Sequence, residues 1–283
     1  MRPGKPSRTA QFVALNRALG NLAPRVPGFS DPFSVQFLPE KWRERVEKVR
    51  ASLASGARTL PYALWQRPMG TFTQFRTVIL DRALAAALPV AQLVILGAGL
   101  DSRAWRLDSL KDTIVFEVDF PASQAWKRER AASIRFQAKD VRFVAVDFQH
   151  DPLAPLIQAA GFDPAKRTFW LWEGVTMYLS PAAVSANLGA FAALSAPGSR
   201  IALTYLREKH GRVPRSIVLA LVGEPLRSAF AADEITALAA SHGWTRIQDS
   251  DLPDWLKETP GLKLAQRRIG IQFLESIWVG EIS

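Results

Sequence analysis

Residues 92–106 read QLVILGAGLDSRAWR and constrain the fold more than any other stretch. The short apolar run at residues 93–96 lies between the breakers Pro89 and Gly97, which is typical of a buried parallel strand rather than a helix. The glycines of the following turn lack Cβ atoms, so a ligand can approach the backbone there. We expect a helix to begin near Asp101. In an open α/β sheet, small ligands bind at such a strand-to-helix corner.

This turn differs from a dinucleotide-binding fingerprint at two positions. Ser102 stands where the third glycine is required, and Asp101 adds a negative charge where a pyrophosphate needs a helix N-terminus free of one. An acidic side chain here suits a ligand with cationic groups, such as S-adenosylmethionine with its sulfonium and ammonium. The alternative is a tight turn in which Asp101 only caps the helix.

Composition limits the other classes. The chain has 283 residues, 48% of them apolar, and we expect a single domain over residues 1–283. There is no cysteine, and the three histidines lack ligand spacing, so no protein-bound metal is expected. Without a membrane-spanning run or signal-peptide pattern, the expected location is cytoplasmic. The net charge of +10 attracts anions, but the bases are scattered and no RNA-binding motif is present, so nucleic acid is an unlikely partner.

Three helices are expected before the glycine turn, and strands alternate with helices after it. The first helix is expected to begin at Thr9 and end before Pro24. The next two cover about residues 40–55 and 70–88, and together the three form an N-terminal helical cap over residues 1–88. Later helices are expected near residues 121–135, 153–160, 181–193 and 232–242.

The alternation over residues 89–283 predicts parallel βαβ units. The expected strands are residues 93–96, 113–119, 142–148, 168–172, 200–206, 246–249 and 271–279. With the last as an antiparallel edge partner, they form an α/β, doubly wound, mostly parallel, seven-stranded Rossmann-like sheet. Residues 207–230 interrupt the rhythm and are interpreted as an insertion, or lid, after the fifth strand.

Acidic residues or glycines end four of these strands. They are Gly97 with Gly99, Asp119, Asp147 and Glu173. Because parallel strands end at one edge of a sheet, these residues should converge on one crevice. Asp119 lies 22 positions after Gly97, close to the spacing at which a carboxylate accepts hydrogen bonds from two ribose hydroxyls. Asp147 is placed to accept from an adenine amino group beside Phe148, and Glu173 to face an ammonium. Each residue alone has a structural alternative, such as a helix cap or a solvated strand end.

Several of these segments resemble one family. The chain contains, in order, ILGAGLDSRAWRL, FEVDFPASQAWKRER, AVDF and WEGVTMYLSPAAV, which are similar to the successive signatures of the leucine carboxyl methyltransferase family. They are most similar to its bacterial branch of S-adenosylmethionine-dependent O-methyltransferases, as are SRTAQFVALNRALG and a later DPF. The resemblance covers about residues 7–205. It implies a methyltransferase fold with S-adenosyl-L-methionine as cofactor.

The resemblance also implies roles for single residues. Gly97 would line the methionine part of the cofactor, and Asp119 would hold the ribose. Asp147 and Phe148 would frame the adenine, and Glu173 would meet the amino group.

Two basic residues before the first strand resemble family positions as well. Arg76 resembles the arginine that pairs with the cofactor carboxylate, a role that suits a guanidinium because it donates two charge-assisted hydrogen bonds. Arg17 resembles a second basic residue of the cap, which we assign to the substrate. The chain departs from the family at Ser102, where threonine is usual, and at Phe148, where leucine is common. Residues 207–230 are short beside the insertion with which eukaryotic members grip a protein phosphatase, so a phosphatase tail is not the expected substrate.

A carboxylate acceptor is already ionised at neutral pH and needs no base, whereas a hydroxyl does. The scarcity of histidine and the absence of cysteine therefore favour a carboxylate or an acidic hydroxyl. We expect O-methylation of a small acidic metabolite of polyketide type by a monomer or homodimer. Arg207 and Arg212, with Lys209, are expected to guide the acid. Candidates for orienting the acceptor are Tyr178, Tyr205 and His210, which have packing as their alternative role.

Other functions remain open at this point. The chain could be an RNA or protein carboxyl methyltransferase, which would use its positive charge. It could also be a non-catalytic module that only binds S-adenosylmethionine. A nicotinamide oxidoreductase is the least favoured, given Asp101 and Ser102.

Overall fold

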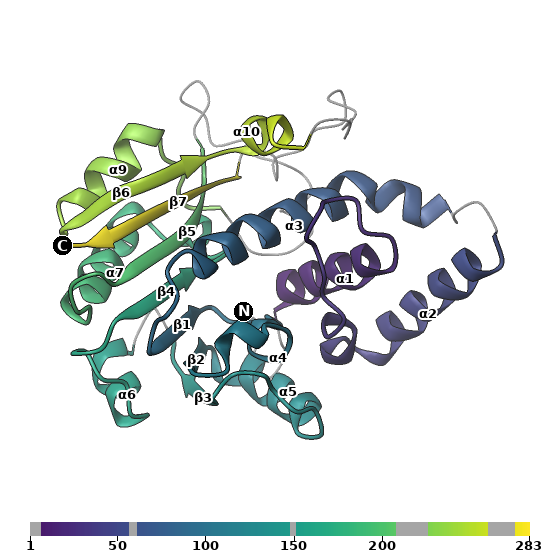
Figure 1. Ribbon diagram of the computed structural model, residues 1–283, viewed down its shortest axis with the longest axis horizontal. Helices are drawn as coiled ribbons and strands as arrows, with labels where there is room; N and C mark the ends of the chain where they lie inside the picture. Colours follow the sequence, from purple (N-terminus) through teal and green to yellow (C-terminus); the bar gives the residue numbers. More distant parts are fainter. Residues whose placement is uncertain (1–6, 57–60, 148–150, 208–225, 260–274) are drawn as a thin grey trace.

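The computed structural model describes residues 7–56, 61–147, 151–207, 226–259 and 275–283, with residues 61–68 as backbone only. Seven strands form one mixed sheet in the order β3-β2-β1-β4-β5-β7-β6 (Figure 1). The strands are β1 Gln92–Leu96, β2 Ile114–Asp119, β3 Asp140–Ala145, β4 Thr168–Trp172, β5 Arg200–Leu206, β6 Trp244–Ser250 and β7 Glu275–Ile282. Strands β1 to β5 pair in parallel, and β7 is antiparallel to both of its neighbours. The expected fold class is confirmed.

Strand β1 lies at the centre of the parallel part, between β2 and β4. All five of its residues are buried, as expected for an apolar run that helices cover on both faces. The strand order reverses beside β1, so the loop that follows it opens at the switch point where α/β sheets bind ligands. The glycine turn therefore occupies the position that its sequence predicts.

Helices pack on both faces of the sheet (Figure 1). On one face lie α1 Arg8–Leu22, α3 Pro61–Ala85, α4 Arg103–Arg106, α5 Pro121–Ala131 and α10 Leu252–Lys257. The other face carries α6 Leu153–Ala159, α7 Pro181–Ala193 and α9 Ala232–Ala240. Helix α2, Glu40–Ala54, packs against α1 on the outside. Three short 3-10 helices are η1 Ser34–Phe37, η2 Asp108–Leu110 and η3 Thr176–Tyr178.

The N-terminal helices share their core with the sheet. Leu15 of α1 and Phe72 of α3 belong to the same buried cluster as Leu93 and Ile95 of β1. The helices and the sheet thus share one buried cluster, and the domain division into a cap and a core stays a prediction. In the described part of the chain, no helix combines the length and apolar character that a membrane crossing needs.

Several element boundaries differ from those predicted. Helix α3 begins at Pro61, not near residue 70, and β3 spans Asp140–Ala145 instead of 142–148. The helix near Asp101 is short, because α4 covers only Arg103–Arg106. The prediction that the last strand lies at the edge of the sheet is wrong. Strand β7 lies between β5 and β6, and its first six residues are buried. Of the expected insertion, only Arg207 and residues 226–230 are described.

Candidate functional site

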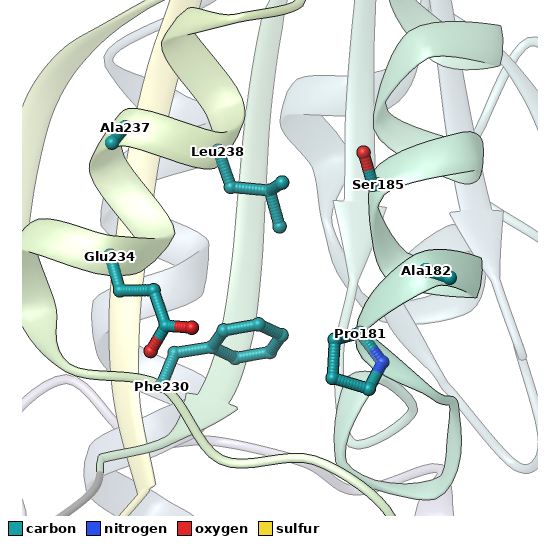
Figure 2. A pocket seen from close by; sticks show the side chains of 7 residues that line it. All are labelled: Pro181, Ala182, Ser185, Phe230, Glu234, Ala237 and Leu238. Atoms are coloured by element: carbon teal, nitrogen blue, oxygen red, sulfur yellow. The ribbon is translucent and has the colours of Figure 1, made fainter.

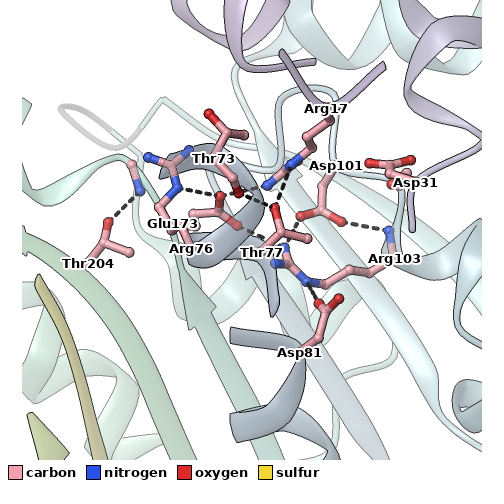
Figure 3. Close-up of polar contacts among 12 residues, drawn as sticks. Arg17, Asp31, Thr73, Arg76, Thr77, Asp81, Asp101, Arg103, Glu173 and Thr204 are labelled. Carbon is pink, nitrogen blue, oxygen red and sulfur yellow. Dashed lines mark hydrogen bonds and ion pairs between the residues drawn. The ribbon is translucent and has the colours of Figure 1, made fainter. Parts of the chain in front are cut away.

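Three arginines surround one carboxylate at the end of β4 (Figure 3). Oε1 of Glu173 accepts hydrogen bonds from Nη2 of Arg17 at 2.6 Å and from Nε of Arg76 at 2.9 Å. Its Oε2 accepts from Nη1 of Arg103 at 2.9 Å. All four side chains are buried. We call these residues, with the groups that bind them, the arginine cluster.

The three guanidinium groups come from separate helices on the same face of the sheet. Arg17 lies on α1, and its Nε also donates to Oγ1 of Thr77 on α3 at 3.2 Å. Arg76 lies on α3, one residue before Thr77, and Arg103 opens α4 directly after the glycine turn. The cluster therefore forms only when the two long N-terminal helices dock on the strand ends.

Further carboxylates balance these charges. Arg103 forms an ion pair with Asp101 and donates from Nε to Oδ1 of Asp81 at 2.7 Å. Arg106 Nη2 lies 2.7 Å from the other oxygen of Asp81. Arg76 Nη1 donates to Oε2 of Glu275, the first residue of β7, at 2.8 Å. Each guanidinium of the cluster thus has a carboxylate partner, as buried charges require.

The electrostatics keep these groups ionised. Burial alone would raise the pKa of Glu173, but the charges of Arg17, Arg103 and Arg76 outweigh it and hold that pKa far below its usual range. For Asp101, burial is likewise outweighed, chiefly by Arg103, and its pKa is lowered. Burial lowers and the Glu275 and Glu173 charges raise the pKa of Arg76, with a net increase. Such a dense buried array of charges is typical of a functional site.

The glycine turn lies beside this cluster. Gly97 and Gly99 have φ angles of +64° and +49°, which favour glycine. A Cβ on Gly97 would lie 2.5 Å from Cγ2 of Val175, and one on Gly99 would lie 3.0 Å from Cβ of Ala10. Protein atoms therefore take up the space next to each missing Cβ. The role of Gly97 beside the methionine part of the cofactor stays a prediction.

Asp119 ties the turn to the end of β2. Its Oδ2 accepts from the Gly99 amide and its Oδ1 from the Phe120 amide, both at 2.6 Å. The carboxylate thus binds the loop that follows β1, at the glycine turn, and the residue that follows β2. Asp147 follows β3 and is half-buried, and its amide donates to Oδ2 of Asp151 at 2.8 Å. Phe148 lies outside the described residues.

The structure thus brings most of the predicted cofactor residues to one edge of the sheet. Arg17, Arg76, Asp101 and Glu173 belong to one network of contacts, and Asp119 contacts the turn next to it. Their roles toward a ligand stay predictions. Sequence reasoning missed further members of the site, among them Asp81, Arg103 and Glu275. Arg103 resembles any basic residue in a first helical turn, and Glu275 belongs to a strand whose place in the sheet was predicted wrongly.

Among the described residues that were predicted for the acceptor, Tyr205 and Arg207 bind partners outside the arginine cluster. Tyr205 packs in the buried cluster on the opposite face, with Trp278 and Phe230. Its hydroxyl lies 2.9 Å from Oδ2 of Asp249, and burial together with that carboxylate raises its pKa. Arg207 binds Asp249 as well, at 2.9 Å.

Tyr178 is half-buried in η3, after β4, where its amide donates to the Val175 carbonyl at 2.9 Å. His210, Lys209 and Arg212 lie outside the described residues. Their assignments, like that of Tyr178, stay predictions.

A buried ion pair lies next to Asp119. Its carboxylate belongs to Glu117, two residues before Asp119 on β2, so the two side chains are on the same face of the strand. Lys127 Nζ of α5 lies 2.6 Å from Oε1 of Glu117, and both side chains are 1% exposed. The ammonium also faces the rings of Trp105 and Phe37, at 4.9 and 5.5 Å from their centroids. Burial, opposed in part by Lys127, raises the pKa of Glu117 to about 7.

A groove between α7 and α9 is separate from this site (Figure 2). Ser185, Phe230 and Leu238 are among its lining residues, and Phe230 and Leu238 belong to the core on the opposite face from Arg76. Ser185 Oγ lies 2.9 Å from Nε2 of His242, which links the two helical segments. We assign this groove no part in the chemistry of the arginine cluster.

The chain belongs to the leucine carboxyl methyltransferase family, whose model matches residues 10–192. A relative from Mycobacteroides abscessus is 32% identical over 267 residues, covering 86% of this chain and 84% of its own. One from Mycolicibacterium paratuberculosis is 34% identical over 202 residues, covering 66% and 64%. Both are placed by name among the S-adenosyl-L-methionine-dependent methyltransferases, which confirms the predicted family and cofactor.

Two further facts limit what is transferred. The chain spans less than two thirds of the length of the first curated relatives it matches, at 64% and 45%. A crystal structure from Thermobifida fusca, also named as a methyltransferase, covers 100% of this chain and 97% of its own with a TM-score of 0.58. Its sequence identity is 17%, so it supports the fold alone.

Proposed function

We propose that this protein is an S-adenosylmethionine-dependent O-methyltransferase that acts on a carboxylate or acidic hydroxyl of a small acidic metabolite, with polyketide-type acids as the first class to test. The observation that carries the proposal is Glu173, held between the guanidinium groups of Arg17, Arg76 and Arg103. The amino-acid end of the cofactor carries one positive and one negative charge. Its ammonium can pair with the carboxylate and its carboxylate with a guanidinium of the arginine cluster, so that no buried charge is left without a partner.

In this proposal Glu173 holds the cofactor ammonium and Arg76 its carboxylate. Gly97 borders the methionine part, and Asp119, which binds the Gly99 and Phe120 amides, is assigned to the ribose hydroxyls. Asp147 is assigned to the adenine amino group. Phe148 is assigned to the adenine ring.

Asp101 contributes negative charge beside the sulfonium, held in place by Arg103. When bound, the cofactor supplies an electrophilic methyl group, and the residues of the chain contribute mainly by fixing its position and that of the acceptor. Arg17, on the docked helix α1, is assigned to the anionic part of the acceptor. Arg207 and Arg212 are further candidates for that contact, although Arg207 is held by Asp249.

Calorimetry on the variant Asp119→Ala tests the cofactor site. Loss of two hydrogen bonds to a charged group is expected to cost about 3 kcal/mol, or roughly 100-fold in affinity for S-adenosylmethionine. The matched control is Asp112→Ala, an exposed aspartate near the opposite end of β2, which should bind as tightly as wild type. Wild-type affinity in the Asp119 variant, with a normal thermal melt, would exclude the assigned pocket.

The activity itself is tested with methyl-labelled cofactor and a panel of small acids and phenols. Transfer to a small molecule supports the proposal. Cofactor binding without transfer to any panel member favours a non-catalytic module. RNA binding that weakens steeply with salt, accompanied by labelled RNA, favours the nucleic-acid alternative, and label on protein carboxyl groups favours a protein methyltransferase.

A further inference from the structure

We propose that Glu275 contacts the methyl acceptor and takes up its proton, which makes the acceptor a hydroxyl compound rather than a carboxylate. The inference rests on the proposed methyltransferase function and narrows its substrate class. Glu275 lies outside residues 10–192, which match the family, so the assignment concerns this chain's own C-terminal strand.

Glu275 reaches the cofactor edge because β7 runs against the other strands. It is the first residue of β7 and pairs with Leu206, the last residue of β5. Its Cα therefore lies at the edge where the parallel strands end, close in the sheet to Glu173 after β4. Neighbouring strands are about 4.8 Å apart, so β7 lies roughly 10 Å from β4, with β5 between them.

One guanidinium joins the two carboxylates across that distance. Arg76 donates from Nε to Oε1 of Glu173 at 2.9 Å and from Nη1 to Oε2 of Glu275 at 2.8 Å. The contacts proposed for the cofactor run from Asp147 after β3 through Asp119 to Glu173 after β4. The next positions along the edge belong to β5 and β7, so Glu275 lies beyond Glu173, on the side away from the contacts proposed for the adenine.

The second oxygen of Glu275 points to a missing donor. The residue is 3% exposed, and its buried Oε1 has no hydrogen-bond partner within the part of the chain that the structure describes. The other described carboxylates of the arginine cluster, Glu173, Asp101 and Asp81, each use both oxygens. A buried carboxylate oxygen without a donor is uncommon and calls for an explanation. A hydroxyl of the acceptor supplies that donor.

This geometry discriminates between acceptor types. A hydroxyl acceptor donates its proton to Oε1, while Arg76 fixes the carboxylate through Oε2. A carboxylate acceptor has no proton to donate at neutral pH and would place a second negative charge against Oε1. The pairing therefore favours an alcohol or phenol over an acid group as the reacting atom.

Methyl transfer to a hydroxyl at this position conserves atoms and charge. The acceptor oxygen forms a bond to the methyl carbon, and the carbon–sulfur bond breaks with its electron pair left on sulfur. The hydroxyl proton moves to Oε1 of Glu275 and is then released to water. One methyl ether and one proton are formed for each cofactor consumed.

The variant Glu275→Gln tests the proposal. The glutamine carbonyl can still accept from Arg76, but the base is lost. The probes are 2-naphthol and 2-naphthoic acid, which differ only in the reacting group. We expect wild type to methylate 2-naphthol, and the variant to lose about 100-fold or more in kcat. Its affinity for S-adenosylmethionine should stay within about twofold. The control is Glu281→Gln on the same strand, whose carboxylate is 37% exposed and binds Arg200.

The outcomes separate this inference from the proposed function. Wild-type kcat in Glu275→Gln, preference of wild type for 2-naphthoic acid, or cofactor binding without methylation of 2-naphthol would each overturn the role of Glu275. A loss of cofactor affinity in the variant as large as the loss of kcat would also overturn it, because Glu275 would then only hold Arg76. Failure of wild type to bind S-adenosylmethionine would refute the proposed function itself.

Discussion

Replacing Lys127 with methionine should destabilise the protein strongly and in a pH-dependent manner. The change removes the cation that lies 2.6 Å from Glu117 and leaves that carboxylate in a place where it is 1% exposed. Breaking a buried ion pair from one side costs about 3–5 kcal/mol. Methionine keeps most of the contact with the rings of Phe37 and Trp105, so the loss reports mainly the unpaired charge.

The pH dependence follows from Glu117. Its pKa is 4.5 in the unfolded reference and about 7 in the folded protein, where burial outweighs the help of Lys127. The folded state therefore binds this proton more tightly. The contribution of Glu117 to the free energy of unfolding is therefore largest below pH 4.5 and declines as the pH rises toward 7. At 1.36 kcal/mol per pKa unit, the decline amounts to about 3 kcal/mol. Without Lys127 the folded pKa rises further, so the deficit of the variant relative to wild type should be small at pH 5 and largest at pH 8.

Urea unfolding at pH 5 and pH 8 measures this difference. The double variant Glu117→Leu with Lys127→Met removes both charges and should lie within about 2 kcal/mol of wild type. The control Arg82→Met breaks an exposed pair with Glu258, whose side chains are 59% and 57% exposed, and should cost less than about 1 kcal/mol. A Lys127→Met protein that loses under 1 kcal/mol at pH 8, or equally much at both pH values, would refute the reasoning.

Two further substitutions test the turn and the cluster. Gly97→Ala adds a Cβ 2.5 Å from Cγ2 of Val175 at a φ of +64°, so we expect the free energy of unfolding, measured by thermal unfolding, to fall by about 2–4 kcal/mol. Adding Val175→Ala should restore the part of this loss that comes from the steric clash. If nothing is restored, backbone strain alone is responsible. Arg103→Lys keeps the positive charge, but a lysine cannot bind Asp81 and Glu173 at the same time. We therefore expect calorimetry to show that S-adenosylmethionine binds about tenfold more weakly. An unchanged affinity would argue against a positioning role for Arg103.

The parallel part of the fold was predictable because its signal is local. Strands β1 and β4 are short apolar runs, and the strands from β1 to β5 alternate with helices. The shared edge of parallel strands then places Asp119 and Glu173 on one side of the sheet whatever the exact boundaries. The position of β7 was not predictable in this way. The sequence pattern of an apolar antiparallel strand is the same whether the strand lies at the edge of a sheet or between two other strands. The start of α3 was missed for a related reason. Gly70 suggests a helix start, yet it lies inside the helix and faces α1, where a Cβ on Gly70 would lie 3.8 Å from Oδ1 of Asn16.

Three carboxylates of the site were predictable, as were Arg17 and Arg76, but several of their contacts were not. Asp101, Asp119 and Glu173 follow strands, so topology alone collects them. Arg103 and Glu275 meet Glu173 and Arg76 across 70 and 199 positions of sequence, and contacts at such separations leave no periodic signal in a single chain. The same holds for Lys127, which as one basic residue among several on α5 shows no sign of being buried.

Arg76 has a consequence for how ligands at the two ends of the site influence one another. The same guanidinium donates to Glu173 and to Glu275. A molecule that replaces one of these carboxylates as the partner of Arg76 therefore also changes the strength of the hydrogen bond to the other. Cofactor and acceptor would then bind with linked affinities, and linkage requires the factor to be equal in both directions. A dissociation constant measured for either molecule alone would differ from the value that governs turnover.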